Sequence, residues 1–188
     1  MDKSMNETLQ AIAKRYTCRA YDGAPVDKDT LEAIAMAGAQ APTAVNGQRF
    51  RIIMVSDKAL VDEMEKVALA YLQEHDPEAS QRAASRGGKV FYDASAMMIV
   101  LISHEGRWSP ELDAGIVVEN MAIAATALGV ASGINAMAYA SLAGDGGSGL
   151  RARLQVPEGF EFAIALLLGY AKEAGQAHEP ATDKIIRV

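Results

Sequence analysis

The chain has 188 residues, of which 50% are hydrophobic and 22% are charged, a composition typical of one ordinary globular domain. Its formal net charge of −6 argues against a general affinity for nucleic acid, because phosphates favour a basic surface. No stretch approaches the roughly 18 uncharged apolar residues of a membrane span, and the first residues lack the apolar run of a signal peptide. We therefore expect a cytoplasmic protein with no membrane and no nucleic acid among its partners.

Metal-binding side chains are sparse in this sequence. Cys18 is the only cysteine, so no internal disulfide can form. The three histidines, His75, His104 and His178, stand far apart and give no metal-ligand spacing. We therefore expect no structural metal.

The first part of the chain reads as two helices. Apolar residues at helical spacing predict a helix that ends near Arg15, with Ser4 or Asn6 as its capping residue. A second helix is expected between Asp27, which can cap it, and Pro42, which must end it.

The middle of the chain alternates between strands and helices. Residues 50–55 and 96–102 are apolar and partly β-branched, which predicts two buried strands. A charged helical stretch runs from Asp57 to about His75, and residues 76–92 look like a mobile helical flap.

A long helix is expected from Ser109 to Gly129, with apolar groups around most of its circumference and therefore burial nearly all round. In so short a chain, a second copy of the protein covers such a helix most easily, which predicts a homodimer. Beyond this helix we expect a short strand over residues 133–139, a short helix over 150–154 and a last strand over 162–168.

The order of these elements has no regular βαβ rhythm, which predicts an α+β sheet flanked by helices in a single domain over residues 1–188. The tail from about residue 170 to 188 has no core of its own. Its end, from Lys184 to Val188, is apolar and basic and suits a contact along another subunit.

A first polar cluster lies at the predicted end of the first helix. Arg15, Thr17 and Arg19 bring two guanidinium groups and a hydroxyl together, a donor set that fits phosphate best. Composition by itself favours a plainer interpretation, in which these are solvated charges at a helix end.

A second polar cluster is the loop from Pro42 to Gln48. Its side-chain amides, on Asn46 and Gln48, suit the edge of a flat heteroaromatic ring that carries N–H and C=O groups. Formation of the turn alone also explains an Asn-Gly pair here.

Residues 144–149 match the dinucleotide fingerprint G-x-G-x-x-G letter for letter. The context that the fingerprint needs is missing, because no clear strand precedes it and Pro157 soon stops the helix that follows. We interpret this segment as a flexible surface turn.

Five motifs follow one another across nearly the whole chain: Arg15-x-Thr17-x-Arg19-x-Tyr21, Ala41-Pro42-Thr43-x-x-Asn46-x-Gln48-x-Phe50, Tyr92-Asp93-Ala94-Ser95, Asp113-x-Gly115 before a helix that ends Ala127-Leu128-Gly129, and Leu168-Gly169-Tyr170. In order and spacing they resemble the nitroreductase family. The resemblance implies an α+β fold with a central, mostly antiparallel sheet, an intertwined homodimer, and FMN bound between the subunits.

The resemblance also implies where FMN is held. The residues that match its phosphate and ribityl site are Arg15, Tyr16, Thr17 and Arg19. A basic residue of the C-terminal tail completes that site in similar proteins, with Lys184 as the nearest candidate and Arg187 as the second.

Two further segments match parts of the family that contact the flavin ring. Pro42, Thr43, Ala44 and Asn46 match a loop that reaches the flavin from the partner subunit, and Gln48 supports that loop structurally. The other segment comprises Gly133, Ile134, Asn135, Ala136 and Met137.

In similar proteins a main-chain N–H of that second segment, here Ala136 or Met137, points at flavin N5, so no catalytic side chain is required. In the flap, Lys89 is the candidate for a basic residue at the isoalloxazine edge. The chain departs from the usual Gln-Pro-Trp at Arg49, which could alter substrate preference.

The implied activity moves a hydride from NADH or NADPH through flavin N5 to a nitroaromatic, a quinone or another flat electron-poor small molecule, by ping-pong kinetics. Other branches that share the fold dehalogenate, fragment flavin or oxidise azoline rings. From a different class, an FMN-binding or storage module without turnover is the alternative.

Overall fold

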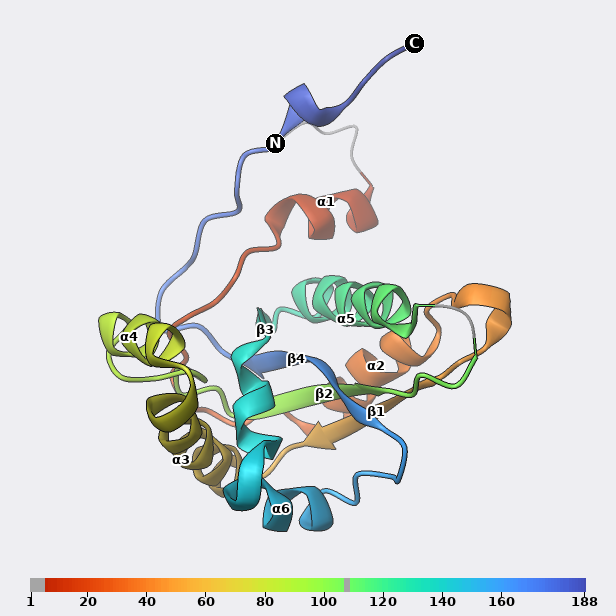
Figure 1. The fold of residues 1–188 in the computed structure, drawn as a ribbon. Helices are drawn as coiled ribbons and strands as arrows, with labels where there is room; N and C mark the ends of the chain where they lie inside the picture. The colour runs from red at the N-terminus through yellow and green to blue at the C-terminus, as the bar shows by residue number, and fades with distance from the viewer. Residues whose placement is uncertain (1–5, 107–108) are drawn as a thin grey trace.

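The computed structural model describes residues 6–106 and 109–188 (Figure 1). Helices flank both faces of one sheet within this part of the chain. The α-helices are α1 (Glu7–Lys14), α2 (Lys28–Ala39), α3 (Lys58–His75), α4 (Pro77–Ser85), α5 (Pro110–Ala127) and α6 (Gly144–Arg153). The strands are β1 (Phe50–Val55), β2 (Ala96–Ile102), β3 (Ala131–Asn135) and β4 (Glu161–Gly169), and the short 3-10 helices are η1 (Ala44–Asn46), η2 (Met137–Leu142) and η3 (Thr182–Lys184).

The sheet has the strand order β1-β2-β4-β3, and every neighbouring pair is antiparallel. Ile99 in β2 pairs with Ile53 in β1 and with Ala165 in β4. Among the described strands, β3 pairs only with β4 and therefore lies at an edge of the sheet. The predicted α+β class with an antiparallel sheet is confirmed.

Strand β2 lies in the interior and all of its residues are buried, as its apolar run predicts. Ile99 belongs to the core cluster beneath α3 and η2, whereas Val100 belongs to the cluster beneath α2 and α5. Because alternate side chains point to opposite faces, two hydrophobic cores form on the two sides of one sheet.

The first two helices begin where their capping residues predict. The Asn6 side chain accepts a hydrogen bond from Leu9 N at 3.0 Å, and Asp27 accepts one from Thr30 N at 2.9 Å. The alternative cap, Ser4, lies outside the described residues.

Helix α5 packs its inner face on the sheet and on α2, burying Val117 and Met121. Its outer side leaves Leu112 72% and Ile116 41% exposed. The expected burial nearly all round is therefore not reached within one chain.

The predicted strand over residues 133–139 is corrected by the structure, in which β3 ends at Asn135 and η2 follows from Met137. The side chain of Asn135 accepts a hydrogen bond from Ala138 N at 2.9 Å. This bond satisfies a main-chain donor that would otherwise belong to a strand ladder, and it turns the chain into η2.

The glycine-rich segment at residues 144–149 is helical and opens α6, so its interpretation as a surface turn is wrong. It packs on η2 and α3, where contacts outweigh the low helix propensity of glycine. A Cβ on Gly147 would overlap the main chain of Leu142, so close packing explains that glycine. The segment follows η2, and every strand pair in the described sheet is antiparallel, which excludes a βαβ dinucleotide site here.

The expected flap is helical over α4, where Asp76 caps the helix by accepting a hydrogen bond from Ala79 N at 2.9 Å. Ala79 and Ala83 are buried in the core cluster beneath α3. In Figure 1 α4 lies at one end of the sheet, beside α3.

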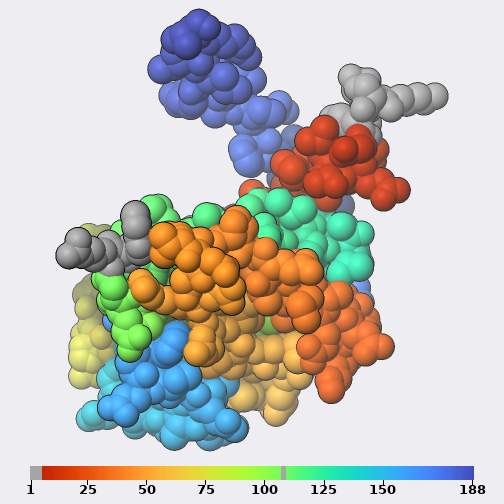
Figure 2. Space-filling view, turned by 90° about the vertical axis from the view of Figure 1, so that its right-hand side faces the viewer, coloured from red at the N-terminus to blue at the C-terminus, as the bar shows by residue number. Residues whose placement is uncertain are grey.

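Helix α1 and the C-terminal tail lie beyond α5, on the same side of the sheet (Figure 1). Helix α1 packs on α5, and the tail after β4 runs past α1 and away from the sheet (Figure 1). Figure 2 shows the tail, in dark blue, projecting clear of the other elements. Ile186 is 87% exposed. None of the described helices combines the length and apolar character that crossing a membrane requires.

Candidate functional site

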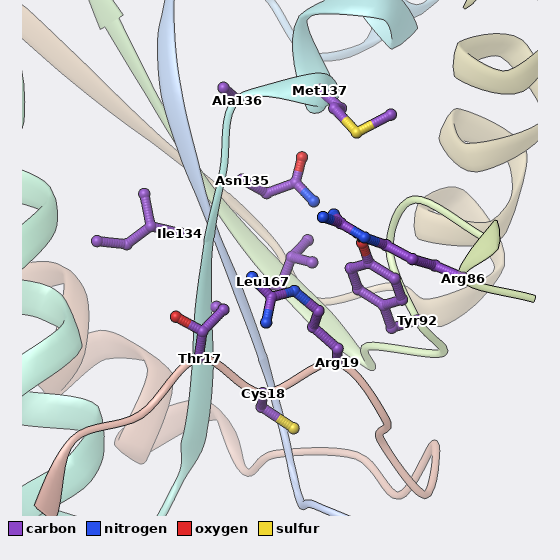
Figure 3. A pocket seen from close by; sticks show the side chains of 11 residues that line it. Thr17, Cys18, Arg19, Arg86, Tyr92, Ile134, Asn135, Ala136, Met137 and Leu167 are labelled. Carbon is purple, nitrogen blue, oxygen red and sulfur yellow. The ribbon is translucent and has the colours of Figure 1, made fainter. Parts of the chain in front are cut away.

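A cavity of about 90 Å³ opens beside the edge strand β3, between the segment after α1 and the flap (Figure 3). Segments far apart in the sequence form its walls. The lining residues are Thr17, Cys18, Arg19, Arg86, Tyr92, Gly133, Ile134, Asn135, Ala136, Met137 and Leu167.

The segment after α1 reaches the cavity by lying along β3. Cys18 N donates to the carbonyl of Ser132 at 2.8 Å. This approach needs a glycine at position 133, because a Cβ there would lie 2.8 Å from the Cys18 carbonyl oxygen. In the resulting extended segment, Thr17 and Arg19 lie on the cavity side, whereas Cys18 points away and is buried (Figure 3).

The opposite wall comes from the end of the flap. The guanidinium of Arg86 donates from Nη1 to the Tyr92 hydroxyl at 3.2 Å. Tyr92 and Asp93 both have left-handed backbones, with φ of 56° and 67°. This sharp turn places Tyr92 against the cavity, which Arg86 and Asn135 also line (Figure 3).

The charge of the cavity is positive, although the whole chain carries −6. No carboxylate is among the lining residues. Among the described residues, neither Arg19 nor Arg86 forms an ion pair with a carboxylate. Two guanidinium groups and the Thr17 hydroxyl are therefore available to an anionic ligand, and phosphate fits such donors well.

The main chain of β3 also faces the cavity. The Ser132 carbonyl points outward to Cys18, so the backbone groups of Ile134, two residues later, point to the same side. The Asn135 side chain serves the protein itself, because its Nδ2 donates to the Val90 carbonyl at 2.7 Å and its Oδ1 accepts from Ala138 N. Ala136 and Met137 then continue the wall into η2.

Two residues of the Arg15–Tyr21 motif, Arg15 and Tyr16, contact groups outside the cavity. Arg15 pairs through Nε with Glu119 of α5 at 3.2 Å, and the Tyr16 ring packs against Gly175 at the start of the tail. Neither lines the cavity of this chain.

The other predicted basic residues also lie outside the cavity lining. Lys89 pairs with Asp93, and this hydrogen bond holds the pKa of the Asp93 carboxyl below its ordinary value. Lys184 pairs with its neighbour Asp183 at 2.7 Å on the projecting tail, where Arg187 is exposed as well.

The loop that carries Pro42, Thr43, Ala44 and Asn46 lies at the other end of the sheet from α4 (Figure 1). Gln48 supports it from within, as expected, because its N–H donates to Thr43 Oγ1 at 3.0 Å and its Nε2 donates to Asn46 Oδ1 at 2.7 Å. Ala44 N donates to the Asp113 carboxylate at 3.1 Å. One chain therefore does not bring this loop and the cavity together.

Arg86 was not among the residues predicted for the cavity, and Tyr92 was identified only as part of the Tyr92-Asp93-Ala94-Ser95 motif. Arg86 precedes Gly87-Gly88, and a cation beside two glycines at the end of a helix was a signal that could have been followed. Counting back from Tyr92 to the nearest basic residue selects Lys89 instead, but the left-handed turn folds Lys89 toward Asp93.

The fold is close to that of solved nitroreductases. A nitroreductase with bound FMN from Desulfitobacterium hafniense is 39% identical, with a TM-score of 0.88 over 98% of this chain and 99% of that one. A nitroreductase with bound FMN from Bacteroides fragilis is 27% identical, with a TM-score of 0.86 over 98% of this chain and all (100%) of the other.

Sequence comparisons agree with the structural ones. A curated relative, the FMN reductase [NAD(P)H] of Bacillus subtilis, is 35% identical over 54 residues, which span 29% of this chain and 22% of that protein. The sequence model of the Nitroreductase family matches residues 12–170, most of the chain. The protein therefore belongs to the nitroreductase family.

Proposed function

We propose that the protein is an FMN-dependent NAD(P)H oxidoreductase that works as a homodimer on flat, electron-poor acceptors such as nitroaromatics or quinones. The observation that carries this proposal is the carboxylate-free cavity at β3, with Arg19 and Arg86 free of acidic partners among the described residues. Two similar nitroreductases are described with bound FMN, and the B. subtilis relative is named for FMN and NAD(P)H.

The residues of the cavity fit the parts of FMN. Arg19 and Thr17 would hold the phosphate and the ribityl chain by charge-assisted hydrogen bonds. Arg86 would lie at the ring, in the role expected of Lys89, and its positive charge would favour an anionic reduced ring. FMN itself supplies the hydride chemistry when bound.

The main chain at the end of β3 would complete the reaction site. Ala136 and Met137 line the cavity, and a fixed N–H there would donate a hydrogen bond toward the ring without any reorganisation. This arrangement explains why the cavity needs no acid–base dyad of side chains.

We propose a second copy because one chain alone forms only part of a flavin site. A cavity of about 90 Å³ is smaller than the roughly 300–1,000 Å³ of usual ligand pockets. The polar loop Pro42–Asn46 lies at the far end of the sheet, and the outer face of α5 is apolar and exposed. We propose that a partner subunit covers α5 and brings its loop to this cavity. Its tail would supply Lys184 or Arg187 to the phosphate site at Thr17 and Arg19, beside Arg15 and Tyr16 in the chain.

The proposal is tested by the absorbance spectrum of the purified protein, analysis of released flavin, and anaerobic titration with NADH and NADPH. We expect FMN that bleaches with at least one nucleotide and is reoxidised by a nitroaromatic or a quinone. Flavin that stays oxidised would support a binding or storage role, and a protein that cannot be loaded with FMN would contradict the assignment.

Single substitutions in the cavity test its donors. Arg19→Ala and Arg86→Ala should each raise the Kd for FMN by about 10–100-fold, because each removes a charged hydrogen-bond donor. Arg153→Ala is the control, since that arginine pairs with Glu63 on the surface of α6. Fluorescence titration of the apoprotein with FMN measures all three variants, and equal affinities would contradict the placement of the flavin.

A further inference from the structure

Glu65, in the middle of α3, makes contacts that the proposed reaction does not use. Its Oε1 accepts hydrogen bonds from two successive main-chain N–H groups, Val90 at 2.7 Å and Phe91 at 2.6 Å. Both of these residues are buried. Two adjacent N–H groups form a concave donor site for an anion, and here the carboxylate of Glu65 fills it.

Two more hydrogen bonds fix the turn formed by residues 90–93. Asn135 of β3 donates to the Val90 carbonyl at 2.7 Å, and Tyr21 N donates to the Tyr92 carbonyl at 3.0 Å. The left-handed conformations of Tyr92 and Asp93 are unfavourable for residues with a side chain and persist only where surrounding contacts fix them. Glu65 supplies the charged part of that restraint.

Fixing this turn also fixes a wall of the cavity. Tyr92 lines the cavity directly, and its hydroxyl accepts the hydrogen bond from Arg86. Both main-chain donors engage Oε1 of Glu65, and among the described residues this carboxylate forms no ion pair with Arg86. The Arg86 guanidinium thus stays available to a ligand.

We propose that Glu65 is a positioning residue that sets Tyr92 and, through it, Arg86 against the flavin. The inference rests on the proposed function, since it assumes that FMN occupies the cavity. It adds a contribution from α3, an element that does not line the cavity, to flavin affinity and to the redox properties of the bound flavin.

The test is a double-mutant cycle between Glu65→Gln and Arg86→Ala, read by FMN titration and by the midpoint potential of the bound flavin. Gln keeps an acceptor oxygen but loses the charge that strengthens both bonds. We expect Glu65→Gln to raise the Kd for FMN about three- to tenfold. We also expect both Glu65→Gln and Arg86→Ala to make the midpoint potential more negative, because each weakens the hold of a positive charge on the reduced flavin. In the Arg86→Ala background the effect of Glu65→Gln should be much smaller, because residues that act as a unit are not additive.

The matched control is Glu63→Gln, two residues earlier in α3, whose carboxylate pairs with Arg153 on the surface. It should change neither measurement. Wild-type affinity and potential in Glu65→Gln would overturn the inference, and so would an equal effect with and without Arg86, which indicates general loosening of the fold. A wild-type protein that takes up no FMN would instead contradict the proposed function.

Discussion

The absence of a side chain at Gly133 allows the segment after α1 to lie against β3 and form one wall of the cavity. A Cβ at this position would lie 2.8 Å from the Cys18 carbonyl oxygen and 3.2 Å from the Tyr21 hydroxyl. The first of these atoms belongs to the main chain and cannot rotate away. Thr17 and Arg19 therefore depend on Gly133 for their place beside β3.

Gly133→Ala should push the Cys18 segment off the strand edge. We expect a loss of about 1–3 kcal/mol in the free energy of unfolding, as for other overpacked sites, together with weaker FMN binding. Urea denaturation of the apoprotein and FMN titration measure the two effects. Unchanged stability and affinity would mean that the segment does not lie on β3 as described.

At the residue scale, the sequence predicts the side chains that belong to a contiguous motif. Thr17 and Arg19 line the cavity together, because an extended segment presents alternate residues to one side. Arg86 was not predictable in the same way, since its place depends on the left-handed turn at Tyr92 and on hydrogen bonds from α3 and β3.

At the element scale, α6 shows where local sequence rules lose to packing. Its first residues are rich in glycine, which disfavours a helix, yet they are helical and lie against η2 and α3. By contrast, β1 and β2 have the predicted bounds, because short apolar runs that contain β-branched residues favour strands. The predicted burial holds for all of β2, whereas in β1 only Val55 is buried. Long-range contacts, which cannot be read from the sequence, make the glycine-rich start of α6 helical.

Substitutions at two glycines of α6 distinguish the effect of close packing from the effect of helix propensity. Gly147→Ala should destabilise the protein by about 1–3 kcal/mol, because its Cβ would overlap Leu142. Gly149→Ala, which has open space around its Cβ position, should be neutral or stabilise by up to about 1 kcal/mol. Thermal unfolding of both variants provides the comparison, and stabilisation by both would show that η2 and α6 are not in close contact.

At the scale of the whole molecule, one chain carries the two parts of the proposed flavin site at opposite ends of its sheet. The cavity with Arg19 and Arg86 lies beside β3, and the loop with Thr43 and Asn46 lies next to Asp113 at the start of α5. The exposed apolar face of α5 and the projecting tail suit burial against a second copy. The apolar sequence of α5 predicts a homodimer, whereas the separation of the loop from the cavity became visible only in the structure.

Complementation between two differently tagged chains tests this account most directly. One chain carries Arg19→Ala with Arg86→Ala, and the other carries Thr43→Ala with Asn46→Ala, so a mixed dimer has one intact site and one doubly damaged site. Each variant alone should retain little flavin. The purified mixed dimer should hold one FMN per two chains and bleach anaerobically with NADH or NADPH. A mixed dimer that holds no more flavin than its parents, or a wild-type monomer that is fully loaded with FMN, would contradict a flavin site shared between two copies.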